Sequence, residues 1–289
     1  MCSDFIVTKY WLATLVLAIV LSSPGCGALQ PPDANGPRGN LAPYPIVLTN
    51  EREDVRDRRL AWRQLSQRYA LPNNISPNLD PLTATIKSLP DNTRTPIFLP
   101  KVGTGPTQTE EETRESLRRF LVEWRRLIGA DPSQLSLVER TDEPSGIKLA
   151  RYEQRPFRYP LRGGFGNLII RFRADRQVLE LSSNCIPNTD RLQASLSTLT
   201  PKVTSEDASS HVKGQSTTIV NPAGQQQNFT LPSDSAVEVR QLVVYALPSK
   251  DQQNVLEVRL AWEIAVTNSP IKTIYLDAIA DQVIAVSQA

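Results

Sequence analysis

Apolar and polar residues alternate near the end of the chain, and this pattern limits the possible folds more than any other in the sequence. Every second position from 256 to 266 is apolar, namely Leu256, Val258, Leu260, Trp262, Ile264 and Val266. Glu257, Arg259 and Glu263 lie on the opposite face. A period of two residues is typical of a β-strand with one buried face, so we expect a strand over 255–267.

Patterns on both sides of this strand predict the rest of a sheet and a helix to cover it. Further strands are expected near 216–220, 235–246, 271–277 and 282–287. Residues 221–228, rich in Asn and Gln, indicate a polar loop. Thr204 and Asp207 can cap a short helix that continues to about Lys213.

The first half of the chain repeats this plan. Thr109 and Glu112 form a capping box at the start of a helix over 110–128, and Gly129 stands where the helix should end. Its apolar stripe needs a sheet to pack on, which four short strands between 137 and 183 can supply. An earlier helix is expected over 51–70, with Leu60, Trp62, Leu65 and Tyr69 on one side. The fold class is therefore α+β, with two subdomains that each pack a helix on an antiparallel sheet and a Leu/Ser/Thr-rich connector at 189–202.

Several motifs resemble the propeptides of thermolysin-like metallopeptidases. Residues 260–264 (LAWEI) and 274–284 (IYLDAIADQVI) resemble the PepSY module, and 203–208 resembles the start of its helix. Residues 80–89 resemble the opening N-P-x-T-G-x-x-x-S-L segment of the fungalysin/thermolysin propeptide (FTP) module. The resemblance covers roughly 78–289. It implies two cystatin-like subdomains and a protein that binds a peptidase as an inhibitor or a folding aid.

The chain departs from the family pattern at three places. Ala84 and Asp281 stand where the family prefers glycine, and 155–160 replaces a Y-x-G-I-P-V run. In a peptidase precursor a catalytic domain would follow the PepSY module, whereas this sequence ends at Ala289. We therefore expect a propeptide-like module without its enzyme, with an FTP-like subdomain over 78–188, a PepSY-like one over 189–289 and an N-terminal helical segment over 51–77.

The N-terminus carries a targeting signal. Residues 10–21 form an apolar run that is too short to span a membrane and is typical of a signal peptide. Cys26 follows closely and resembles the lipidated cysteine of bacterial lipoproteins, which predicts a signal peptide over 1–25, a flexible tether over 26–50 and a cell-envelope location. Ordinary cleaved secretion and a retained anchor are the alternatives. Acylation of Cys26 would leave Cys185 unpaired, as a small buried hydrophobe.

Catalytic chemistry is poorly supported. His211 is the single histidine, so the two histidines of a zincin motif are not present, and there is no CxxC pair for zinc. Residues 163–166 (GGFG) precede a strand instead of opening a helix, which indicates a turn and not a phosphate loop. The net charge of +2 gives no reason to expect a nucleic-acid partner. We expect a protein that is not an enzyme and that uses neither metal nor cofactor.

One cluster of aromatic and arginine residues stands out. Its members are Tyr152, Arg155, Phe157, Arg158, Tyr159 and Arg162. They either pack the edge of a hairpin or form a surface that binds a partner. Two classes of function remain: a membrane-anchored partner of a separately encoded secreted peptidase, or a cell-envelope lipoprotein that uses the fold as a scaffold.

Overall fold

The computed structural model describes residues 43–49, 52–72, 74–90, 95–105, 108–143, 145–220 and 226–288, and these form an α+β protein. Its helices are α2 (Arg52–Arg68), α3 (Glu110–Ile128), α4 (Thr189–Ser197) and α5 (Ser205–His211). The strands of the first half are β2 (Asn78–Leu79), β3 (Ile86–Ser88), β4 (Leu135–Asp142), β5 (Ile147–Gln154), β7 (Asn167–Arg173) and β8 (Val178–Ser183). The remaining strands are β1 (Ile46–Thr49), β6 (Leu161–Arg162), β9 (Ser216–Val220), β10 (Gln226–Thr230), β11 (Val237–Pro248), β12 (Val255–Val266), β13 (Ile271–Asp277) and β14 (Val283–Gln288).

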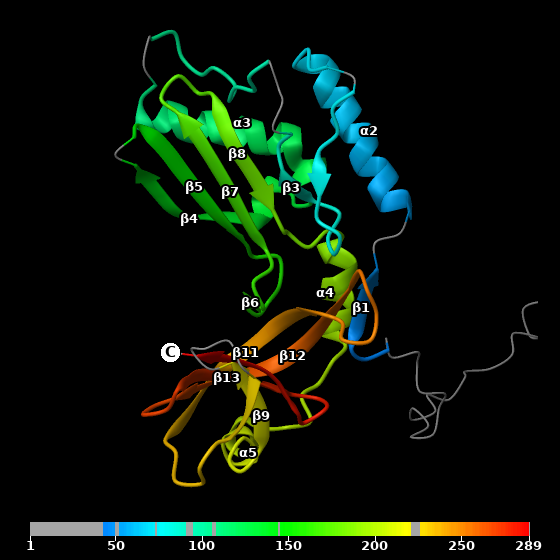
Figure 1. Cartoon of the computed structure of the whole chain (residues 1–289), viewed down its shortest axis with the longest axis vertical. Coiled ribbons are helices and arrows are strands. Elements are labelled where there is room, and N and C mark those ends of the chain that lie inside the picture. The colour runs from blue at the N-terminus through cyan, green and yellow to red at the C-terminus, as the bar shows by residue number, and fades with distance from the viewer. Residues whose placement is uncertain are drawn as a thin grey trace, which may run out of the picture. The chain divides into compact units, whose positions relative to one another are not determined.

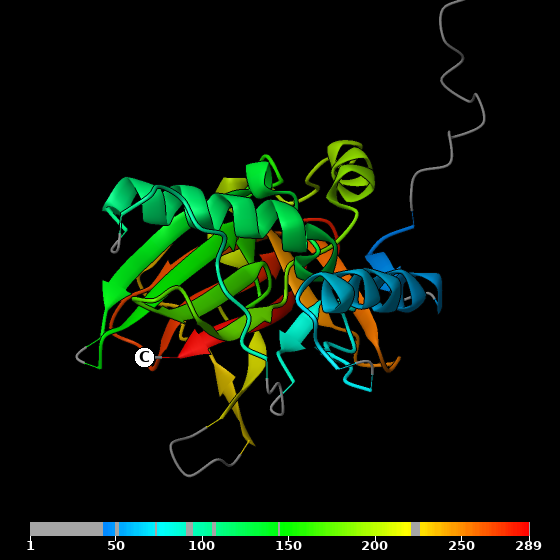
Figure 2. The same cartoon turned by 90° about the horizontal axis from the view of Figure 1, so that it is seen from above.

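Helix α3 confirms the sequence prediction at both ends. The Thr109 side chain accepts a hydrogen bond from the Glu112 backbone, and the Glu112 carboxylate accepts one from the Thr109 backbone, which closes the capping box. Gly129 ends the helix with φ of 82°, in the left-handed conformation that glycine adopts without strain. The helix lies across one face of the antiparallel sheet β4-β5-β7-β8 (Figures 1 and 2).

A first core fills the space between this sheet and helices α3 and α2. Trp124 is fully buried there, and its ring lies 6.2 Å from that of Trp62 and 5.9 Å from that of Tyr69. Helix α2 therefore packs on α3 through Trp62, and Tyr69, directly after α2, adds a second aromatic contact. The expectation that Leu60 shares this buried face is wrong, because Leu60 is 43% exposed and Ala61 is buried in its place.

The second sheet has the order β14-β13-β12-β11-β6, and β1 also pairs with β12. Strand β12 is its centre, and burial alternates as predicted only from Leu256 to Leu260. From Ala261 to Val266 both faces are covered, because Ala261, Glu263 and Ala265 are buried as well. Ile264 and Val266 lie in the second core, which is covered by α5. Leu256 and Val258 lie in the third core, which is covered by α4. The apolar face of one long strand is thus covered by two helices in succession.

The predictions for the tether, the connector and the polar loop need correction. The tether was expected to reach residue 50, but β1 pairs with β12 from Ile46↔Val258 to Thr49↔Val255, because the apolar run IVLT can complete the sheet. The connector at 189–202 contains helix α4, which buries Leu192 and Leu196, four residues apart on one helical face. The loop at 221–228 is wrong for 226–228, which belong to β10 and pair with β9.

Residues on both sides of the boundary predicted at 188/189 contribute to the second sheet and to the third core. Strands β1 and β6 precede this boundary in sequence but lie in the second sheet. The third core likewise joins Ile46 and Ile186 to Val244 and Val258. The contacts group 42–289 into one compact unit. The two sheets are therefore connected by the segment that contains β6 and by a core formed from both halves of the chain, as well as by the linker at the predicted boundary.

Candidate functional site

The segment between β5 and β7, residues 155–166, runs from the first sheet to the second and back. We call it the crossing segment. The Arg155 amide donates to Gln134 O (2.7 Å), and the Gly166 amide donates to Asn184 O (3.0 Å). In the second sheet, the Val244 amide donates to Pro160 O (2.9 Å), where β6 pairs in parallel with β11. Backbone hydrogen bonds therefore fix this segment at both ends and in its middle.

Two glycines permit this path. Gly163 has φ of 96°, and a Cβ there would lie 1.8 Å from Ala246 O, so a side chain would push the segment away from β11. Gly166 has φ of 79°, and a Cβ there would lie 2.5 Å from Leu161 Cδ2. The glycines at 163–166 therefore form a tight connection between two sheets, in agreement with the predicted turn.

A buried amide fixes the start of the crossing segment. The Gln154 side chain is 2% exposed, its Nε2 donates to Ile186 O (2.9 Å), and its Oε1 accepts from the Ile186 amide (2.8 Å). Both polar ends of the amide are satisfied, as burial requires. Because Ile186 belongs to the third core, the amide connects the end of β5 to that core.

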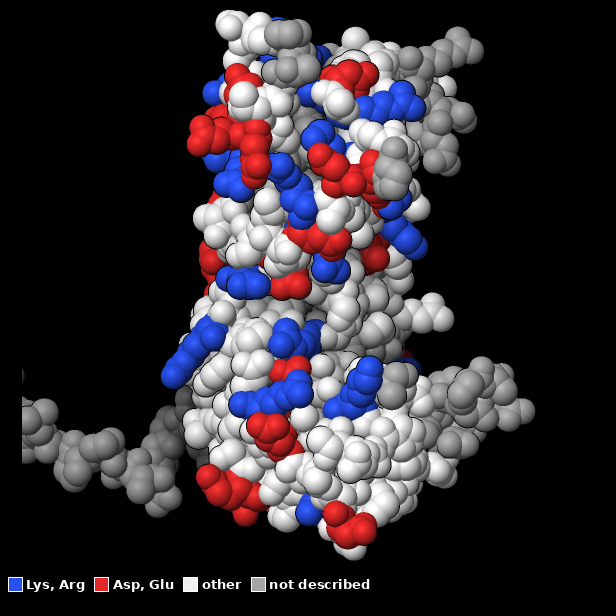
Figure 3. Space-filling model, turned by 90° about the vertical axis from the view of Figure 1, so that its left-hand side faces the viewer, with Lys and Arg blue, Asp and Glu red and all other residues white. Residues whose placement is uncertain are grey.

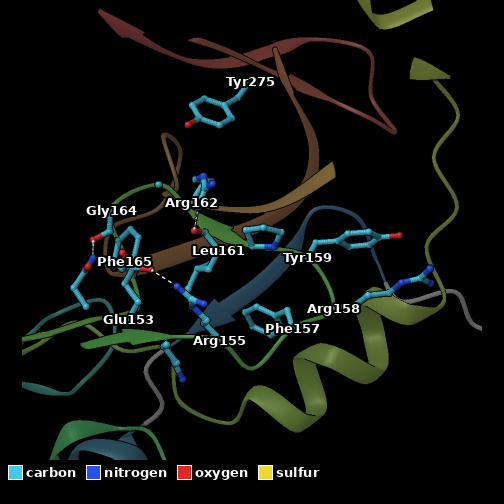
Figure 4. Close-up of a pocket in the computed structure, with 15 residues that line it drawn as sticks. Glu153, Arg155, Phe157, Arg158, Tyr159, Leu161, Arg162, Gly164, Phe165 and Tyr275 are labelled. Carbon is cyan, nitrogen blue, oxygen red and sulfur yellow. Dashed lines mark hydrogen bonds and ion pairs between the residues drawn. The ribbon is translucent and has the colours of Figure 1, made fainter. Parts of the chain in front are cut away.

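The crossing segment borders a hollow of about 790 Å³, with Tyr275 of β13 on its far side (Figure 4). Its aromatic side chains Phe157, Tyr159 and Phe165 are half-buried and pack against the third core. Arg155 and Arg158 are exposed. The lining contains three arginines and one glutamate, Glu153, and Arg162 is paired with Glu263 behind it, so the net charge of the hollow with Glu263 included is +1.

Arg162 supports the hollow from within the second sheet. Its Nε lies 3.0 Å from Glu263 Oε1, and Gln241 Nε2 and Tyr275 Oη also donate to that carboxylate, at 2.8 and 3.4 Å. Burial tends to raise the pKa of Glu263, but the hydrogen bonds from Arg162 and Gln241 outweigh it and hold the pKa below its ordinary value. Glu263 is therefore ionised at neutral pH and orients Arg162.

The structure brings five of the six predicted site residues together. Arg155, Phe157, Arg158, Tyr159 and Arg162 all line the hollow. Tyr152 does not, because it lies on β5 with its side chain in the first core, where burial raises its pKa to about 12. Tyr152 thus stabilises the sheet that precedes the crossing segment.

A second polar cluster lies on the same face of the second sheet and was not foreseen. Asp277 is fully buried, and its Oδ1 accepts from Tyr44 Oη (2.6 Å) and from the amides of Ile279 and Ala280 (both 2.9 Å). Arg259 Nη1 donates to Oδ2 (2.9 Å). The motif at 275–278 marks Asp277 in the sequence, but nothing in it indicates a partner 233 positions away.

The two residue types most open to catalytic interpretation lie in separate places. Cys185 is buried in the first core, and burial raises the pKa of its thiol to about 12, which keeps it protonated. His211 is exposed on α5, with Nδ1 2.9 Å from Asp281 Oδ1. Within the described part of the chain, no group of three or more His, Cys, Asp or Glu side chains could hold a metal ion.

The predicted lipidation residue Cys26, together with the signal peptide, lies outside the described residues. Among the helices that are described, none has the length and apolar character needed to cross a membrane. On the face shown in Figure 3, positive and negative side chains are interspersed.

Comparison with known proteins adds no assignment: no family model and no curated protein matches this chain.

Proposed function

We propose that this chain is a non-enzymatic, membrane-anchored, propeptide-like protein that binds a separately encoded secreted metallopeptidase as an inhibitor or a folding aid. The observation that carries partner binding is the hollow beside the crossing segment. The exposed side chains of Arg155 and Arg158 and several half-buried aromatic rings line this hollow. Three backbone hydrogen bonds fix the segment that bears them. Arginine and aromatic residues on a rigid support are the side chains that most often dominate protein interfaces.

Two features support the resemblance to FTP and PepSY modules, and with it two cystatin-like subdomains. Helix α3 crosses a four-stranded antiparallel sheet, and α5 covers part of the second sheet. Ala84 and Asp281 both have φ of 53°, at the two positions where the family prefers glycine. Positive φ is unfavourable for a residue with a Cβ and easy for glycine. The backbone at both positions therefore has the conformation for which the family's glycine would be preferred.

The anchor is proposed from the sequence. A lipidated cysteine shortly after a short apolar run would place the mature protein on the outer side of a membrane, with the described residues beyond a tether. More than one acyl chain would give stable attachment. Labelled palmitate should enter the wild-type chain and not a Cys26→Ser variant, and equal labelling of both would contradict lipidation.

The function is tested with a peptidase that carries the HExxH motif, is encoded beside this chain and lacks a propeptide of its own. Its denatured catalytic domain is refolded with and without an equimolar amount of the full chain. A folding aid raises the yield of active peptidase, and an inhibitor lowers the rate at which the folded peptidase hydrolyses casein. If neither yield nor rate changes and the two proteins do not associate, the proposal fails and the scaffold lipoprotein becomes the better account.

A further inference from the structure

We propose that the hollow beside the crossing segment binds a short extended segment of a partner protein in which acidic and apolar residues alternate. This inference rests on the proposed function for the identity of the partner and adds the chemistry of the segment that is recognised. Four observations support it: the charge of the lining, the weak ion pair between Arg155 and Glu153, the aromatic walls and the edge strand β6, where the Leu161 carbonyl accepts only from the guanidinium of Arg162 (3.3 Å) among the described residues.

The positive charge of the hollow is available to a ligand. Arg158 lies over the ring of Tyr159, with its Cζ 5.4 Å from the ring centroid, and no carboxylate among the described residues pairs with it. Arg155 Nη2 is 3.4 Å from Glu153 Oε2, with side chains 63% and 47% exposed. An exposed pair of this kind contributes only about 0–1 kcal/mol, so a ligand carboxylate can replace Glu153 at little cost.

Arg162 has a different role. Its guanidinium is held by Glu263, whose side chain is only 9% exposed. A ligand that displaced this buried carboxylate would leave a charge without its partner, which is costly. We therefore assign the recognition of ligand carboxylates to Arg155 and Arg158. Arg162 stays paired with Glu263 and forms part of the wall of the hollow.

The walls of the hollow suit apolar side chains. Phe157, Tyr159, Phe165 and Tyr275 line it, and the first three rest on the third core, which fixes their positions. Rings that are already ordered lose little entropy when a ligand packs on them. The volume of about 790 Å³ falls within the roughly 300–1,000 Å³ that is common for ligand sites.

A strand edge explains why the segment should be extended. Among the described strands, β6 pairs only with β11, so it forms the edge of the second sheet. Its two residues, Leu161 and Arg162, also line the hollow. A peptide that lies there can run beside this edge and place alternate side chains toward the arginines and the rings.

The test uses two fluorescein-labelled octapeptides, one of alternating Glu and Leu and one of alternating Lys and Leu, with binding to the full chain followed by fluorescence anisotropy. We expect the acidic peptide to bind and the basic one to bind far less. The double variant Arg155→Glu, Arg158→Glu should bind the acidic peptide at least about tenfold more weakly, or about 1.4 kcal/mol. Raising the ionic strength should also weaken binding.

Arg63→Glu is the matched control, because Arg63 is exposed on α2, away from the hollow, and has no ion partner among the described residues. It should bind the acidic peptide as the wild type does. Equal binding of both peptides, or undiminished binding by the double variant, would overturn the proposal. A membrane surface is the competing ligand. The proposal would also be overturned if the acidic peptide does not bind, while a Cys26→Ser chain binds vesicles rich in phosphatidylglycerol and loses this binding when Arg155→Glu and Arg158→Glu are added.

The outcomes also separate this inference from the proposed function. If the acidic peptide binds through Arg155 and Arg158 but the peptidase neither refolds better nor is inhibited, the ligand class stands and the peptidase role fails. If the peptidase responds and the double variant acts on it as well as the wild type, the peptidase role stands and the hollow is not its contact surface.

Discussion

Replacing Trp124 with alanine is expected to reduce the free energy of unfolding by about 3–5 kcal/mol, the usual cost of truncating a buried aromatic side chain. Trp124 is fully buried in the first core and contacts the rings of Trp62, Tyr69 and Phe120. The variant removes the contact through which α2 packs on α3. For a chain of this size the loss corresponds to a fall of roughly 6–20 °C in Tm, measured by circular dichroism.

Arg118→Ala on the same helix is the control. Arg118 is exposed and, among the described residues, pairs only with Glu115, so the Tm of this variant should barely change. Both proteins should unfold in a single transition, because the third core contains residues from both halves of the chain. A Trp124→Ala variant that melts at the wild-type temperature would show that the first core is not packed as described.

Asp277→Ala should be destabilising to a similar degree, by about 3–5 kcal/mol, because it breaks a buried ion pair and leaves the partner charge uncompensated. The substitution removes the acceptor of Arg259 and Tyr44. It also leaves the amides of Ile279 and Ala280 without their acceptor in the last turn. Urea titration should show a lower midpoint with little change in slope.

Two variants separate the parts of this effect. Tyr44→Phe removes a single hydrogen bond to a charged group and should cost about 1.5–3 kcal/mol. Asp251→Ala, in the exposed turn between β11 and β12, should have little effect. If Asp277→Ala were no more destabilising than Asp251→Ala, the buried cluster that holds Tyr44 to the second sheet would not exist as described.

The sequence predicted the elements whose signals are local. The capping box and Gly129 set both ends of α3, and the alternation of 256–266 located β12, because each depends on neighbouring residues alone. Strand β6, by contrast, has two residues and no periodicity of its own. It exists because Gly163 lets the chain approach Ala246, a tertiary contact that no local pattern records.

The sequence indicated several residues of the candidate site but not the strand pairings that bring them together. Five members of the arginine and aromatic cluster line the hollow, whereas Tyr152 faces the first core. Tyr152 alternates with Arg151 along β5, and the sequence did not show which of the two faces is buried. Tyr275 and Glu263 were missed as parts of the site because they reach it through pairing of β12 and β13.

We conclude that the crossing segment is a preformed surface held between the two sheets, a claim that amide hydrogen exchange of the full chain can decide. The amides of Arg155, Gly166 and Val244 donate to Gln134, Asn184 and Pro160, respectively. They should therefore exchange far more slowly than unstructured amides, in the range of the core amides of β7. Exchange of all three at the rate of an unstructured chain would contradict the claim, since the surface would then not exist before a partner binds.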